Sequence, residues 1–130
     1  SGANEVLATV VRERNKVDSG IAVISSTIRD VELETLAANI AQAVGLRYVA
    51  NIQFKRDRHG QPKLLEINPR FPGTMSLTVA AGVNMPEMCL HEAAGLALDG
   101  HYPFKEISMV RTWHETFIEQ GELQLLAEAP

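Results

Sequence analysis

The segment Leu64-Leu65-Glu66-Ile67-Asn68-Pro69-Arg70-Phe71-Pro72-Gly73 is the most informative stretch of this chain. It begins as a β-prone run and ends with two prolines, Pro69 and Pro72, within four residues. Proline lacks a backbone N–H and has a fixed φ, so a strand does not continue through such a pair. We therefore expect a strand over residues 63–67 that leaves its sheet as a structured loop.

A second β-prone run, residues 48–54, lies upstream, and residues 57–60 between the two runs are rich in turn formers. This pattern predicts a β-hairpin. Side chains alternate along a strand, which places Glu66 and Asn68 on one face and the apolar Leu65 and Ile67 on the other. Residues Asn51, Gln53 and Lys55 share the polar face of the partner strand in the same way.

The length of the hairpin loop decides whether the two polar faces coincide. If His59-Gly60 is a two-residue loop, Gln53 lies opposite Glu66 and Asn51 lies opposite Asn68. A four-residue loop leaves Gln53 diagonal to Glu66, still within reach. A three-residue loop would instead turn Gln53 to the opposite face.

A glutamate carboxylate and amide carbonyls are hard oxygen ligands, which suit Mg²⁺ held jointly with nucleotide phosphates. Arg70 follows directly, and its guanidinium suits paired hydrogen bonds to a phosphate or an acyl phosphate. A polar hairpin face is also what an ordinary solvated strand pair presents. Spacing alone therefore leaves both interpretations open.

The motif Asn51-Ile52-Gln53-Phe54, followed by the segment from Leu64 to Arg70, resembles the metal-binding hairpin of ATP-grasp enzymes, most closely the branch related to carbamoyl-phosphate synthase. The resemblance runs from about residue 6 to residue 98. It implies that Gln53, Glu66 and Asn68 bind Mg²⁺ or Mn²⁺ and the cofactor's phosphates, and that Arg70 is a catalytic residue contacting the transferring phosphate.

In the enzymes that the chain resembles, ATP phosphorylates a carboxylate to an acyl phosphate, which an amine or another nucleophile then attacks. The resemblance therefore implies ATP as co-substrate and a carboxylate as substrate. It covers the C-terminal, metal-binding part of an ATP-grasp domain, because the phosphate-covering glycine-rich loop of the first part is absent. We expect residues 1–130 to form that part, with residues 1–3 a cloning remnant, and the isolated chain to be inactive.

A noncatalytic ATP-grasp-like interaction or assembly module is the alternative interpretation. Removing half of a domain exposes apolar surface and strand edges, and self-association buries them again. We therefore expect a homodimer or an aggregation-prone monomer.

The rest of the chain predicts an α+β fold with a largely antiparallel sheet and helices packed on it. Asp30 is a candidate N-cap of a helix that Gly45 ends, because apolar residues recur between them at helical spacing. The remaining expected elements are a strand pair at 5–14 and 21–28, a short helix at 75–81, a helix from Pro86 to about residue 98, and a strand over 107–118.

Composition narrows the class of protein. The hydrophobic fraction of 45% and charged fraction of 22% are ordinary for a soluble globular chain. The net charge of −4, with no basic patch, argues against nucleic acid as a partner. There is no apolar run of roughly 20 residues to cross a membrane, and a single cysteine, Cys89, suits a reducing compartment. We expect a cytoplasmic protein.

A few other residues have two interpretations each. Arg14 and Lys16 precede a segment, residues 18–21, that resembles a family loop near the reacting phosphate, but they are equally well read as solvated charges. Cys89 sits among apolar neighbours on an expected helix, which favours a buried, inert thiol. Trp113 suits either an interface or ligand-stacking role or packing on a core or sheet face, and we expect the latter.

Overall fold

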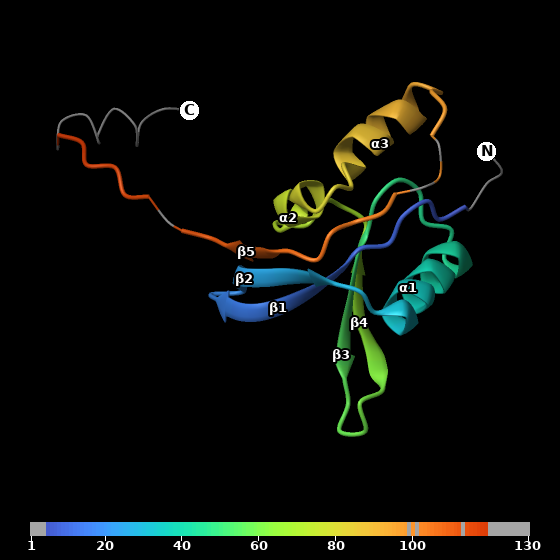
Figure 1. The fold of residues 1–130 in the computed structure, drawn as a ribbon, viewed down its shortest axis with the longest axis horizontal. Coiled ribbons are helices and arrows are strands. Elements are labelled where there is room, and N and C mark those ends of the chain that lie inside the picture. Colours follow the sequence, from blue (N-terminus) through green and yellow to red (C-terminus); the bar gives the residue numbers. More distant parts are fainter. Residues whose placement is uncertain (1–4, 99, 101, 113, 120–130) are drawn as a thin grey trace.

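The computed structural model describes residues 5–98, 100, 102–112 and 114–119. It contains a three-stranded antiparallel sheet in the order β1-β2-β5, a separate β3–β4 hairpin, and three helices (Figure 1). The predicted α+β fold is confirmed. In chain order the elements are β1 (Val11–Asp18), β2 (Ile21–Ile28), α1 (Val31–Ala43), β3 (Asn51–Arg56), β4 (Pro62–Asn68), α2 (Met75–Ala80), α3 (Met85–Ala93) and β5 (Ser108–Val110).

Strands β1 and β2 form a hairpin closed by Ser19 and Gly20, whose φ angles are 48° and 82°. Two successive left-handed residues match the twist of an antiparallel pair, which explains the tight turn. The predicted strand over 21–28 is confirmed, but the predicted strand over 5–14 is wrong, because β1 begins at Val11 and runs to Asp18. Val11 pairs with Ile28, the last residue of β2, so the residues before Val11 have no partner strand on β2.

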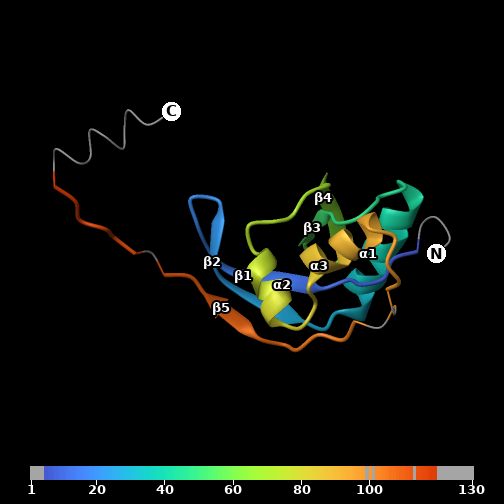
Figure 2. The ribbon, with the colours of Figure 1, turned by 90° about the horizontal axis from the view of Figure 1, so that it is seen from above.

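Strand β5 adds to the other edge of β2 over three residues only, Ser108–Val110. Thr27 anchors the approach to β5, because its buried hydroxyl donates to Lys105 O at 2.7 Å and accepts from the Ile107 N–H at 2.9 Å. The expectation of a strand over 107–118 is therefore wrong in length. Residues 114–119 lead away from the sheet in both views (Figures 1 and 2), and Trp113 lies outside the described residues.

Helix α1 begins as the sequence predicts. The Asp30 carboxylate accepts a hydrogen bond from the Leu33 N–H at 3.1 Å, which satisfies one of the unpaired donors of the first turn. The helix ends at Ala43, and Gly45 follows with a φ of 64°. The cap and the glycine stop are both confirmed.

Helix α2 matches the short helix expected at 75–81, whereas α3 ends at Ala93, earlier than the expected end near residue 98. The end of α3 is set by Gly95, which has a φ of 69°. Leu96 N donates to His91 O at 2.9 Å across this turn, a pattern that satisfies the last helical carbonyls. Gly95 is therefore the helix stop.

The buried core lies between the three-stranded sheet and the segment that carries α2 and α3. Val83 and Ala81 are almost fully buried and pack with Phe104, while Leu77 of α2, 2% exposed, lies on the helix that contacts β2. The β3–β4 hairpin runs across the strand direction of this sheet (Figure 1). Arg56 of β3 holds the hairpin to the start of α1 through ion pairs to Asp30 at 2.7 Å and to Glu32 at 2.9 Å.

Candidate functional site

The β3–β4 hairpin brings together the polar residues that the sequence singled out. Gln53 pairs with Glu66, and Asn51 pairs with Asn68, as predicted. The route to this register differs from all three loop lengths considered, because five residues, 57–61, connect the strands. The Asp57 carboxylate organises this loop by accepting from the N–H groups of His59 at 2.8 Å and Gln61 at 3.0 Å.

A five-residue loop alone would have turned Gln53 to the wrong face of β4. The pairing shifts by one residue between Gln53 and Phe54, so that Leu65 is an extra residue in β4 and the register is restored. The expectation that Leu65 lies on the core face with Ile67 is wrong, since Leu65 is 60% exposed. The bulge aligns Glu66 with Gln53 and leaves Leu65 facing solvent.

Glu66 is the centre of a small polar cluster on this face. Its Oε1 accepts hydrogen bonds from the side-chain amides of both Gln53 and Asn68, the latter at 2.9 Å. Amide oxygen and nitrogen occupy nearly equivalent positions, so a half-turn of each amide would present two carbonyl oxygens beside the carboxylate.

Three oxygen donors on one strand face fit a cation of the Mg²⁺ type. In the described part of the chain, no group of three His, Cys, Asp or Glu side chains could hold a metal ion. With only one carboxylate in the cluster, an ion here would need further oxygen ligands from a bound phosphate, which is how Mg²⁺ commonly binds in nucleotide enzymes.

Arg70 lies on the proline-containing loop that follows β4. The loop turns at once, since Arg70 N donates to Asn68 O at 2.8 Å, and it closes where Met75 N donates to Pro72 O at 3.0 Å. The Arg70 guanidinium is exposed and donates to the neighbouring Phe71 O at 3.2 Å. Arg70 and Gln53 of the polar cluster line the same cleft.

A cleft of about 780 Å³ lies between β1, the hairpin and the loop after β4. Gln53, Asn51 and Arg70 line it, whereas Glu66 and Asn68 do not. Five arginines line this cleft against two carboxylates, although the whole chain is acidic. The charged lining residues are Arg12, Glu13, Arg14, Asp30, Arg56, Arg70 and Arg111.

Two of these arginines, Arg12 and Arg111, were not among the site residues predicted from the sequence. Arg12 of β1 donates to Thr74 Oγ1 at 2.9 Å and to Asn51 Oδ1 at 2.8 Å, and Arg111 donates to Gly73 O at 2.8 Å. Burial lowers the pKa of the Arg12 guanidinium from its usual value. The spacing of Arg12 and Arg14, two residues apart on a strand, was a signal that both face one side.

Arg14 and Lys16 had been interpreted either as part of a functional loop or as solvated charges. Arg14 lines the cleft, and its Nη2 donates to Gly20 O at 2.7 Å, at the turn between β1 and β2. Lys16 is exposed and does not line the cleft. Of these two residues, only Arg14 therefore lies at the candidate site.

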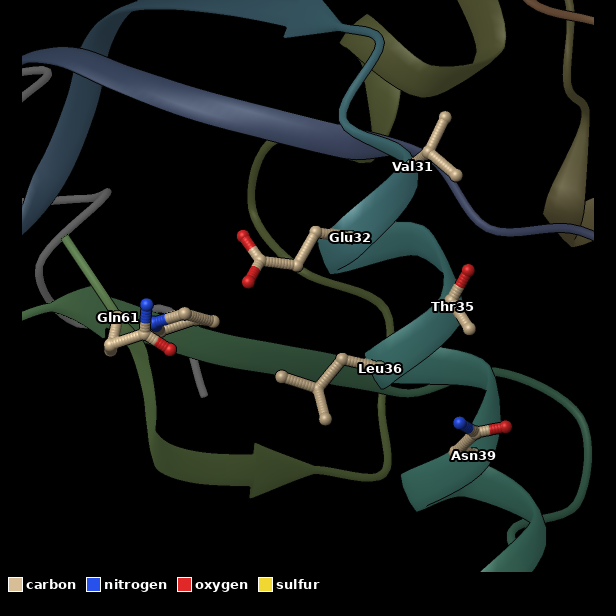
Figure 3. A pocket seen from close by; sticks show the side chains of 7 residues that line it. Val31, Glu32, Thr35, Leu36, Asn39 and Gln61 are labelled. Carbon is tan, nitrogen blue, oxygen red and sulfur yellow. The ribbon is translucent and has the colours of Figure 1, made fainter.

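A second, more open hollow of about 530 Å³ lies between α1 and the hairpin loop (Figure 3). Its wall consists of helix side chains such as Thr35, Leu36 and Asn39, facing Gln61 (Figure 3). Its one charged lining residue, Glu32, is engaged by Arg56. We therefore place the candidate site at the arginine-lined cleft and at the Glu66 cluster, which Gln53 joins to it.

Cys89 does not belong to this site. It lies on α3, half-buried, and burial, aided by the nearby charge of Glu92, raises the pKa of its thiol. A raised pKa leaves little thiolate at neutral pH, which agrees with the expectation of an unreactive cysteine.

An α+β fold, a polar hairpin face and an arginine-lined cleft together describe a module suited to anionic, phosphate-bearing ligands. The sequence model of the family described as "ATP-grasp in the biosynthetic pathway with Ter operon" matches residues 1–116. The chain therefore belongs to this ATP-grasp family, and its fold is consistent with a partial ATP-grasp domain. A search of curated proteins finds no significant match. Within the described residues, no helix is both long and apolar enough to cross a membrane.

Proposed function

We propose that this chain contributes the magnesium and ATP-phosphate site of an ATP-dependent carboxylate–amine, or related, ligase of the carbamoyl-phosphate synthase-like branch. The observation that supports the proposal is the pairing of Gln53 with Glu66, which gathers three oxygen-bearing side chains on one face of the hairpin, the last of them two residues before Arg70 in the chain. A bound Mg²⁺ would neutralise phosphate charge there and orient the phosphates for transfer.

The residues of the chain act in this proposal by positioning and charge. Glu66, with the carbonyl oxygens of Gln53 and Asn68, would hold the ion, and Arg70 would donate to the oxygens of the transferring phosphate. The substrate carboxylate oxygen attacks the γ-phosphorus, the bond to ADP breaks, and an acyl phosphate forms. An amine or another nucleophile then attacks the acyl carbon, and inorganic phosphate leaves.

We further propose that the chain is the C-terminal part of its ATP-grasp domain and that high ATP affinity requires the full-length gene product, called the parent protein below. The isolated chain would then bind ATP weakly and be inactive in ligation. A protein of this kind would work in the cytoplasm.

Calorimetry of magnesium-dependent ATP binding tests this function. The parent protein should bind ATP with Mg²⁺, Glu66→Gln should weaken that binding at least tenfold, and the isolated chain should bind little. Glu92→Gln is the matched control, because Glu92 is an exposed carboxylate on α3 away from the cleft. Equal affinities for the Glu66→Gln and unsubstituted parent proteins would refute the assignment of the site.

A noncatalytic assembly module is the second candidate, and exposed apolar surface favours it. On the folded body, Val31, Leu65 and Leu90 are 75%, 60% and 71% exposed.

Under this second proposal the chain forms a homodimer that covers these side chains. Light scattering over a wide concentration range should then show dimer or larger species at high concentration. A well-dispersed monomer throughout the range would contradict it.

A further inference from the structure

Arginines in the cleft carry charge that no described carboxylate neutralises. Among the residues that the structure describes, ion pairs involve Arg29 and Arg56 but not Arg12, Arg14, Arg70 or Arg111. Each of these four donates instead to uncharged oxygens, from Thr74, Asn51, Gly20, Phe71 and Gly73. The cleft is therefore a concentration of positive charge in an otherwise acidic chain.

The two carboxylates in the cleft lining are engaged elsewhere. Asp30 caps α1 and pairs with Arg56 at 2.7 Å. The Glu13 carboxylate accepts from the Asn15 side chain at 3.1 Å and is exposed. Within the described ranges, no carboxylate supplies the counter-charge for the remaining arginines, which leaves room for an anionic ligand.

Arg12 and Arg111 converge on one short stretch of backbone. Arg12 comes from β1 and Arg111 follows β5, the strands at opposite edges of the sheet. Their guanidinium groups donate to adjacent residues, Thr74 Oγ1 and Gly73 O. Two cations that donate to adjacent residues repel one another, and the cost is larger where one of them, Arg12, is half-buried. A bound anion would relieve that repulsion.

Donors remain for such an anion. A guanidinium has five N–H groups, and the hydrogen bonds to Thr74 and Asn51 account for two of those of Arg12. The bond to Gly73 O accounts for one of those of Arg111. These bonds also fix the orientation of both side chains, so less conformational entropy is lost when a ligand binds.

We propose that Arg12 and Arg111, supported by Arg14, bind an anionic oxygen group of the ligase's acid substrate, either a carboxylate or a phosphate. This inference rests on the proposed function, in which the ATP phosphates occupy the neighbouring cluster of Glu66, Gln53, Asn68 and Arg70. The substrate would thus be a small acid that carries a second anionic group beyond the carboxylate that becomes phosphorylated. Planar guanidinium groups favour such oxyanions through paired, charge-assisted hydrogen bonds.

The test is a titration of the isolated chain with inorganic phosphate and, separately, with succinate, followed by backbone NMR shifts. Phosphate or succinate should shift residues 73–74 and the start of β1, and the stronger of the two probes identifies the anionic group. Arg111→Met should weaken binding of that probe at least about tenfold, the loss expected for a charge-assisted pair. Arg58→Met, an exposed hairpin-loop arginine outside the cleft, is the matched control for general charge.

The Arg12→Met protein should behave like Arg111→Met, and Arg12→Lys should recover part of the binding. Arg12 also connects β1 to Asn51 of β3 and to Thr74, so thermal unfolding is measured on each variant. If Arg12→Met does not fold, the result for Arg111→Met alone decides the test. Glu66→Gln should leave phosphate or succinate binding within about twofold, which separates this site from the proposed metal cluster. In the parent protein, saturating Mg²⁺ and ADP should leave the anion bound.

Three results would overturn the proposal. One is that neither probe shifts residues 73–74. Another is an equal loss of binding in Arg58→Met and Arg111→Met. The third is displacement of the anion by Mg²⁺ and ADP in the parent protein, which would assign these arginines to the nucleotide phosphates. If Glu66→Gln also fails to affect ATP binding there, the proposed function itself falls, whatever the titration shows.

Discussion

Replacing Asp30 tests how the fold supports the hairpin that carries the candidate site. Asp30 caps α1 through the Leu33 N–H and also pairs with Arg56 of β3. Asp30→Ala removes the cap acceptor, for which about 1 kcal/mol of the free energy of unfolding is typical. In a chain of 130 residues, that loss lowers the melting temperature by about 4 °C. Asp30→Asn keeps an oxygen acceptor for Leu33 and should lose less than half as much.

The same residue makes stability depend on pH. The Leu33 N–H hydrogen bond, more than the pairing with Arg56, lowers the pKa of Asp30, and burial only partly opposes this. A group with a lowered folded-state pKa contributes its full stability above its unfolded value, near 3.9, and loses it as the pH falls through the folded value. Thermal melts of the unsubstituted and Asp30→Asn chains should therefore differ at pH 7 and converge in acid. Equal melting temperatures for Asp30→Ala and Asp30→Asn at pH 7 would refute the capping argument.

Three further changes follow from burial. Leu77→Ala opens a cavity at a side chain 2% exposed, so urea unfolding should show a loss of about 3 kcal/mol, and a loss under 1 kcal/mol would contradict the packing. Leu65→Ser, at the exposed bulge, should change the free energy of unfolding by less than about 0.5 kcal/mol; a large loss would mean that this side chain is covered. Because the pKa of Cys89 is raised, iodoacetamide should alkylate it more slowly at pH 7 than a free thiol and faster with rising pH, and rapid alkylation at pH 7 would refute this.

Local signals in the sequence predicted the local structure well. The Asp30 cap and Gly45 stop depend on interactions within one turn of chain, and strand β2 follows a turn whose residues favour positive φ. The pairing of Gln53 with Glu66 was also predicted, although the chain reaches it by a longer loop and a bulge at Leu65. No sequence signal marks a bulge whose extra residue is an ordinary leucine.

The arginine pair could not be predicted, because it depends on contacts between distant parts of the chain. Arg12 lies 62 residues from Thr74 and 39 residues from Asn51. Arg111 reaches the same loop only because the three residues of β5 add to the edge of β2. Sequence periodicity carries no information about which strands become neighbours. The meeting of Arg12 and Arg111 at residues 73–74 therefore depends on a strand order that the sequence does not reveal.

The central claim is that Glu66, Gln53 and Asn68 bind the divalent ion, and paramagnetic NMR tests it most directly. Mn²⁺, added with ADP to the parent protein, should broaden the amide signals of these three residues first, and Glu66→Gln should abolish the effect. Broadening centred elsewhere, for example around Glu32 in the hollow beside α1, or unchanged by Glu66→Gln, would contradict the account.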